Sequence, residues 1–160
     1  MRKPFFLILM CLGVVAQAQS TEEANVTAVI HRLFTGMYRA DSTMVRSAFA
    51  SDVTMISVLR NKEGIPVLRK EKIDGFVKAV GTPQEKPLTE EIWNIQVQLD
   101  GDFAQVWCDY AFYVGHTFSH CGADAFHLYK TAEGWKIFHL ADTRRKEGCN
   151  VPEEIQKKHQ

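Results

Sequence analysis

The sequence predicts an α+β domain with three N-terminal helices packed on one face of a curved, mostly antiparallel sheet. Apolar residues recur at helical spacing before residue 50 and again over 72–80, whereas the second half alternates and is divided by turn signals. With 160 residues, 46% of them hydrophobic and ten of them Phe, the chain has enough material for one core and little for a second.

The helices are expected over 20–37, 42–49 and 72–80. Ser20-Thr21-Glu22-Glu23 has the pattern of a capping box, so Ser20 is expected to cap the first helix. Asp41 or Ser42 is expected to cap the second helix, and Gly81 to end the third.

The strands are expected over 54–59, 65–68, 91–99, 104–114, 118–130 and 135–145. Pro66 favours an edge position for the second of them, and Asp100-Gly101-Asp102 is a strong hairpin signal. The domain is expected to cover 19–149, and the charged tail, 150–160, is expected to fray.

Residues 1–18 have the organisation of a secretory signal peptide. Arg2 and Lys3 precede a run of twelve residues, Phe5–Ala16, which is too short to span a bilayer that needs roughly 20. The step Ala16-Gln17-Ala18 is typical of a cleavage site. We therefore expect export to the periplasm or the medium, without membrane insertion after cleavage.

The charge balance argues against a nucleic-acid partner. Lys and Arg total 19 and Asp and Glu total 19, and loss of 1–18 would leave a net charge of −2. Nucleic-acid-binding proteins usually carry a basic excess.

The order of elements, ending in Gly134-Trp135-Lys136-Ile137, resembles the nuclear transport factor 2-like superfamily, which includes SnoaL-like cyclases, ketosteroid isomerases and scytalone dehydratase. Three stretches are similar to a family of exported bacterial proteins labelled "putative lumazine-binding": 104–110, 119–126 and 134–145. The resemblance implies a cone-shaped, cystatin-like roll. Isomerase-like members carry a carboxylate base on the first strand, where this chain has Met55-Ile56-Ser57-Val58, so the resemblance does not supply that base.

Two tight hairpins would gather polar and aromatic residues on one face of the meander. With Val114 opposite Thr117 and Lys130 opposite Trp135, that face carries the candidate ligand-binding residues Trp107, Asp109, His120, Asp124 and His139. A one-residue slip in either turn would move a whole strand to the other face.

These residues allow more than one interpretation. They could line an aromatic-walled pocket, or they could tie strands together by hydrogen bonds. His120 and Asp124 are the candidate catalytic pair, since a carboxylate can orient an imidazole. No metal and no cofactor is expected, because His120 and Cys121 point to opposite faces of a strand.

Three cysteines remain after cleavage, at 108, 121 and 149. Cys108 and Cys121 would be diagonal neighbours, too far apart for an easy bridge, whereas Cys149 lies beyond the last strand and can fold back. Cys121–Cys149 is the preferred disulfide, with three free thiols as the alternative.

The leading hypothesis is an exported protein that binds a small apolar or aromatic molecule in a pocket, without assured catalysis. The alternatives are a lyase, cyclase or isomerase that uses a His–Asp pair, and a dimeric interaction module without a ligand. Aromatic residues on both faces of the sheet favour a homodimer built through the sheet.

Overall fold

The computed structural model describes the backbone of residues 7–160 and the side chains of residues 19–160. The expected signal peptide, 1–18, lies outside the part of the chain described with side chains, and its cleavage stays a prediction. Within the described part, no helix combines the length and the apolar character needed to cross a membrane.

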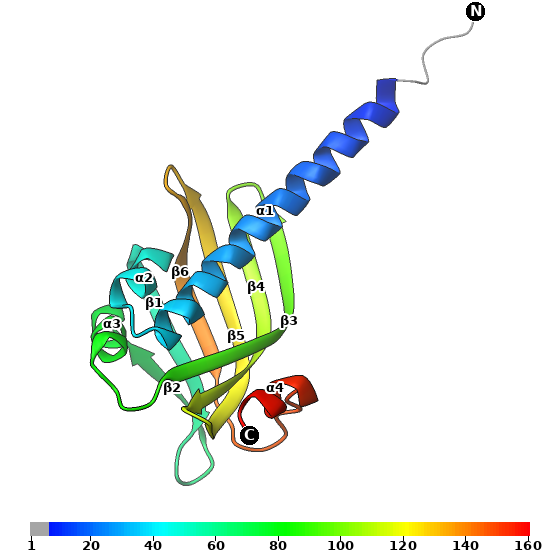
Figure 1. Cartoon of the computed structure of the whole chain (residues 1–160). Coiled ribbons are helices and arrows are strands. Elements are labelled where there is room, and N and C mark those ends of the chain that lie inside the picture. The colour runs from blue at the N-terminus through cyan, green and yellow to red at the C-terminus, as the bar shows by residue number, and fades with distance from the viewer. Residues whose placement is uncertain (1–6) are drawn as a thin grey trace, which may run out of the picture.

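The helical layer consists of one long helix and two short ones, and the long helix extends well beyond the expected range of 20–37. These are α1 (Leu7–Tyr38), α2 (Ser42–Ala48) and α3 (Ile73–Gly81), and α1 crosses one face of the sheet (Figure 1). The expectation that Ser20 caps α1 is wrong, because the helix begins upstream in the apolar segment and continues through Ser20. The cap expected at Asp41 is confirmed, since its carboxylate accepts the Met44 N–H at 2.8 Å.

Six strands form one strongly curved sheet in the order β2-β1-β6-β5-β4-β3. All neighbours are antiparallel except β1 and β6, which run parallel. Their bounds are β1 (Phe49–Arg60), β2 (Pro66–Glu71), β3 (Leu88–Asp100), β4 (Phe103–Val114), β5 (Thr117–Thr131) and β6 (Gly134–Thr143). We call the side that faces α1 the inner face and the opposite side the outer face.

The main core lies between α1 and the inner face. Ile30 and Leu33 of α1 are buried against Phe126 and Ile137 of the sheet. Trp135 is buried at the start of β6, and its indole N–H donates to the Glu22 carboxylate of α1 at 2.9 Å. This hydrogen bond links α1 to the start of β6.

β-bulges change the register that the hairpins alone would give: one lies in the β3–β4 pair between Trp93 and Gln96, and one lies in each of the β4–β5 and β5–β6 pairs. Val114 does pair with Thr117 and Lys130 with Trp135, as expected. The pairing then shifts by one residue at Ser119, so that His120 lies opposite Phe112, and again at Phe138, so that His139 lies opposite His127. Because side chains alternate along a strand, each shift reverses the face of every residue beyond it.

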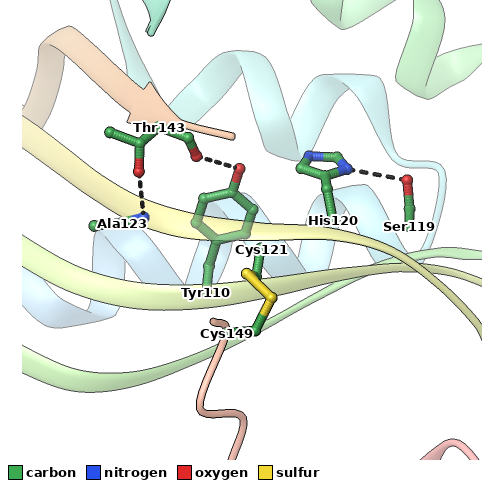
Figure 2. The surroundings of a disulfide bond; sticks show 7 residues. All are labelled: Tyr110, Ser119, His120, Cys121, Ala123, Thr143 and Cys149. Atoms are coloured by element: carbon green, nitrogen blue, oxygen red, sulfur yellow. Dashed lines mark hydrogen bonds between the residues drawn. A yellow bond between two sulfur atoms is a disulfide. The ribbon is translucent and has the colours of Figure 1, made fainter. Parts of the chain in front are cut away.

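The C-terminal segment docks on the sheet, so the expectation that it frays is wrong. Helix α4 (Glu153–Lys158) places Ile155 against Ala111 and Tyr113 of the outer face. The His159 ring stacks on Tyr113 with 3.7 Å between ring centroids. Cys149 is bonded to Cys121 of β5, the pair preferred from the sequence, with 2.03 Å between the sulfur atoms (Figure 2).

Candidate functional site

A cavity of about 230 Å³ lies under α1 and α3, against the inner face of the sheet. Most of its wall is apolar, formed by Leu33, Phe34, Met37, Met55, Phe76, Phe112, Phe126 and Leu140. Every strand of the sheet contributes a polar side chain, and Arg144 follows β6: the residues are Ser57, Glu71, Glu90, Tyr110, His120, Asp124, Asp142 and Arg144. An apolar hollow with a few converging polar groups is typical of a small-ligand site.

The structure brings only two of the five predicted ligand-binding residues to this cavity. His120 and Asp124 line it. Trp107, Asp109 and His139 lie on the outer face, and the interpretation that placed all five together is wrong. The bulge at Ser119 moved His120 and Asp124 to the inner face, whereas the bulge at Phe138 kept His139 on the outer face.

The outer three residues have local roles. The Trp107 side chain is 44% exposed, and Asp109 accepts a hydrogen bond from Asn94 at 2.8 Å. His139 stacks on His127 with 5.0 Å between ring centroids.

Glu90 and Asp124 form a pair of carboxyl groups inside the cavity. Burial raises the pKa of Asp124 well above its usual range, and the neighbouring Glu90 and Asp142 raise it further. Burial likewise raises the pKa of Glu90, from 4.5 to about 7, although a hydrogen bond with Asp124 opposes the change. Two adjacent carboxyl groups that cannot both ionise share a proton, and one of them can then donate while the other accepts.

Sequence reasoning missed Glu90 because the strand was expected to begin at residue 91. The structure starts β3 at Leu88, and Glu90 lies opposite Phe112, whose side chain also lines the cavity. An inward alternation that includes Glu90 and Ile92 was the available signal.

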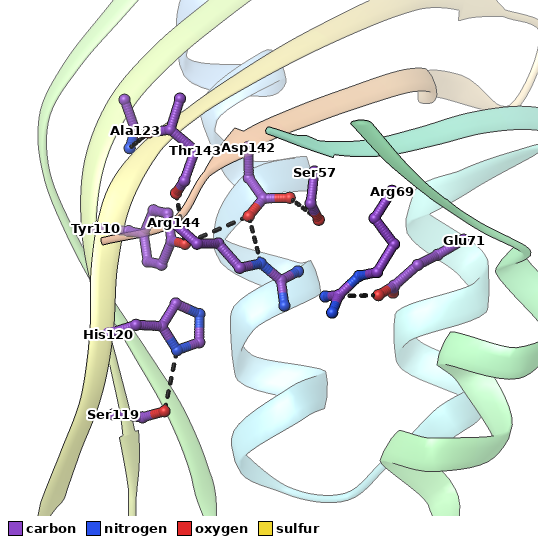
Figure 3. A network of polar contacts seen from close by, with 10 residues as sticks. All are labelled: Ser57, Arg69, Glu71, Tyr110, Ser119, His120, Ala123, Asp142, Thr143 and Arg144. Atoms are coloured by element: carbon purple, nitrogen blue, oxygen red, sulfur yellow. Dashed lines mark hydrogen bonds and ion pairs between the residues drawn. The ribbon is translucent and has the colours of Figure 1, made fainter. Parts of the chain in front are cut away.

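Asp142 is the centre of a second cluster of polar side chains in the cavity, with Ser57, Tyr110 and Arg144 (Figure 3). Its carboxylate accepts hydrogen bonds from Ser57 at 2.6 Å and from the Arg144 Nε at 2.7 Å. Ser57 lies in the β1 stretch Met55–Val58, which has no carboxylate, so the polar group that this stretch presents to the cavity is a neutral hydroxyl.

The Tyr110 ring reaches across Gly122 to the end of β6. Its hydroxyl donates to the Thr143 carbonyl at 2.9 Å, and the Asp142 carboxylate lies 3.3 Å away. Burial raises the pKa of Tyr110, so it is a neutral donor at physiological pH. A Cβ at Gly122 would lie 1.8 Å from the Thr143 carbonyl oxygen, so only glycine permits this close approach.

His120 stands apart from the carboxyl groups. Its Nδ1 lies 3.0 Å from the Ser119 hydroxyl, and its ring packs near Tyr110 and Phe112. Burial and the nearby Arg144 lower its pKa. Among the described residues, no hydrogen bond or ion pair joins His120 to a carboxylate, so the expected His120–Asp124 catalytic pair is not formed.

The site shows no arrangement suited to a metal ion. Over the residues that the structure describes, no three His, Cys, Asp or Glu side chains come together as ligands. What the geometry offers is hydrogen bonding and proton transfer by Glu90 and Asp124 in apolar surroundings.

Residues 21–140 match the model of a family described as "Putative lumazine-binding". The chain belongs to this family. It also has the nuclear transport factor 2-like fold, which confirms the resemblance inferred from the sequence. No curated protein matches the sequence significantly.

Several solved structures share this fold. A nuclear transport factor 2-like protein of unknown function from Shewanella baltica is 21% identical, with a TM-score of 0.62, over 80% of this chain and 97% of that one. A protein with a cystatin-like fold from Nostoc punctiforme is 14% identical (TM-score 0.60, 78% and 92% covered). A "putative dehydratase" from Streptomyces avermitilis is also 14% identical (TM-score 0.61, 79% and 98% covered). At these identities the likeness shows the fold alone.

Proposed function

We propose that the protein is exported and binds a small, largely apolar or aromatic molecule in the cavity under α1. The pair of carboxyl groups of Glu90 and Asp124, in a cavity whose wall is mostly apolar, is the observation that carries the proposal. Burying ionisable groups opposes folding unless they are paired, and perturbed carboxyl groups in a cavity are typical of functional sites.

The chemistry of the pair suggests which edge of a ligand it would hold. A protonated carboxyl donates to a carbonyl oxygen, and an ionised one accepts from an N–H group. Flat heteroaromatic rings with adjacent N–H and C=O groups, such as the lumazine in the family's description, present both. The surrounding Phe and Leu side chains would contact the faces of such a ring.

Titration with lumazine, followed by ligand fluorescence, tests the proposal. We expect Asp124→Asn to weaken binding by up to about ten-fold, because it removes the proton that the carboxyl pair shares, and a neutral hydrogen bond contributes about 0.5–1.5 kcal/mol net. Asp109→Asn is the matched control, since it makes the same change on the outer face and should leave binding intact. Equal effects of the two variants would contradict the placement of the site.

A second candidate function is enzymatic proton transfer, and the pKa of Glu90 near 7 favours it. A general base works best when its pKa lies near the working pH. Exchange of the α-protons of 2-tetralone in D₂O, measured by NMR, would reveal such activity, and Glu90→Gln should abolish it. An exchange rate equal to that of buffer would leave binding as the function.

Export is supported by the organisation of residues 1–18. The test is N-terminal sequencing of protein recovered from the exported fraction. We expect it to begin at Gln19, and a chain that begins at Met1 would contradict export with cleavage.

A further inference from the structure

A basic groove opens beside the cavity, at the ends of β5 and β6. Arg60, Arg145 and Lys146 line it, with Glu147 as its acidic residue. The groove also shares His120 and Arg144 with the cavity, so the two spaces adjoin at these side chains.

The positive charge of the groove is not neutralised within the described part of the chain. Arg144 is paired with Asp142, and the nearby Arg69 with Glu71 at 3.0 Å (Figure 3). No ion pair joins Arg60, Arg145 or Lys146 to a carboxylate among the residues described. Three cations therefore face solvent against one anion.

The charged side chains of the cavity itself are mostly acidic. Its polar corner holds Glu90, Asp124 and Asp142 beside a single guanidinium, that of Arg144. An anion placed deep in the cavity would be repelled there, whereas one at the junction would meet Arg144, Arg145 and Lys146. Burial lowers the pKa of His120, and Arg144, Arg69 and Lys146 lower it further although Asp142 opposes them, so these three cations act on the junction.

We propose that the ligand is an amphiphilic anion: its apolar body fills the cavity and its single carboxylate or phosphate group lies in the basic groove. This inference rests on the proposed function, because it assumes that the cavity is occupied. It narrows the ligand class from small apolar molecules to aromatic or aliphatic acids of matching size.

Calorimetric titration with two probes of the same shape tests the inference. 1-Naphthoate carries a carboxylate, whereas 1-naphthamide carries a neutral amide at the same position. We expect naphthoate to bind about ten-fold more tightly at low salt, and this preference to shrink as salt screens the groove. Inorganic phosphate should compete with naphthoate but not with naphthamide.

The variant Arg145→Gln/Lys146→Gln removes two exposed cations from the groove without touching the cavity wall. It should lose most of the preference for naphthoate and keep its affinity for naphthamide. Arg32→Gln/Lys78→Gln is the matched control, because it removes two exposed charges from α1 and α3. It should retain the preference of the unmodified protein.

Equal affinities for the two probes, or equal behaviour of the two double variants, would overturn the inference. If lumazine still bound in that case, the proposed function would stand. Failure of both naphthyl probes and of lumazine would overturn the proposed function and the inference together.

Discussion

Gly122 is the residue on which the polar end of the cavity depends. A methyl group there would collide with the Thr143 carbonyl and with the Tyr110 ring, 2.6 Å away. We expect Gly122→Ala to destabilise the fold by about 1–3 kcal/mol, the range for overpacking a core, and to displace Tyr110. Thermal melts measure the change.

Gly75 provides the control for this substitution. It lies in α3, and a Cβ there would meet nothing within 4 Å. Gly75→Ala should stabilise the protein by about 0.5–1 kcal/mol, since alanine loses less backbone entropy in a helix. Equal destabilisation by both substitutions would contradict the close approach at Gly122.

Glu90 should make the free energy of unfolding depend on pH. Its pKa is about 7 in the folded protein and 4.5 in the unfolded chain, so the folded state binds the proton more tightly. The stabilisation is therefore complete below pH 4.5 and is lost as the pH rises through 7, up to about 3 kcal/mol. The raised pKa of Asp124 acts in the same direction.

Glu90→Gln should remove most of this loss and leave a variant that is more stable than the unmodified protein at pH 8. Urea melts between pH 4.5 and 8 provide the measurement, with Glu63→Gln, in an exposed turn, as the control. A pH profile that Glu90→Gln leaves unchanged would contradict the burial of this carboxyl.

At the scale of elements, the disulfide holds the C-terminal segment on the outer face. It closes a loop with a sequence separation of 28 residues, for which chain entropy gives about 3.5 kcal/mol. We expect Cys149→Ser to lower stability by about that amount and to speed hydrogen exchange in α4, with little change in β4. Unchanged exchange in α4 would show that Ile155 and His159 suffice to hold it.

The elements themselves could be predicted from the sequence, whereas their register could not. Apolar periodicity and the turn signals at Gly64, Gly101 and Gly134 located most helices and strands to within a few residues, although α1 and β1 begin well before their expected starts. The bulges at Ser119 and Phe138 leave no such signal, because an extra residue in a strand is selected by curvature and packing of the whole sheet.

The sequence therefore predicted only some of the residues of the candidate site. His120 and Asp124 were selected for their chemistry and do line the cavity, but their partners were taken from the wrong face. Glu90, the carboxyl that Asp124 contacts, comes from a strand whose start was placed one residue too late to include it. Tertiary pairing, rather than local sequence, brings the two carboxyl groups together.

At the scale of the whole molecule, the outer face is only partly covered. Helix α4 occupies one end, whereas Phe103, Trp107 and Tyr129 remain 40%, 44% and 42% exposed. Exposed aromatic residues grouped on one face are typical of an interface, so we expect a homodimer built through this part of the sheet.

Trp107→Glu should convert that dimer to a monomer, as measured by light scattering at micromolar concentrations. Tyr38→Glu, at the exposed end of α1, should leave the mass unchanged. A monomer mass for the unmodified protein would contradict the dimer but would leave the proposal of ligand binding in the cavity unchanged.

The central claim is that the ligand lies under α1, against the inner face of the sheet. Methyl chemical-shift mapping with lumazine and with 1-naphthoate tests it most directly, because methyl groups mark both faces. We expect shifts at Leu33, Met55 and Leu140, which line the cavity, and none at Val67 or Leu68 of the exposed edge strand. Shifts confined to methyl groups outside the cavity, such as Ala125 and Ala141 of the outer face, would contradict the claim.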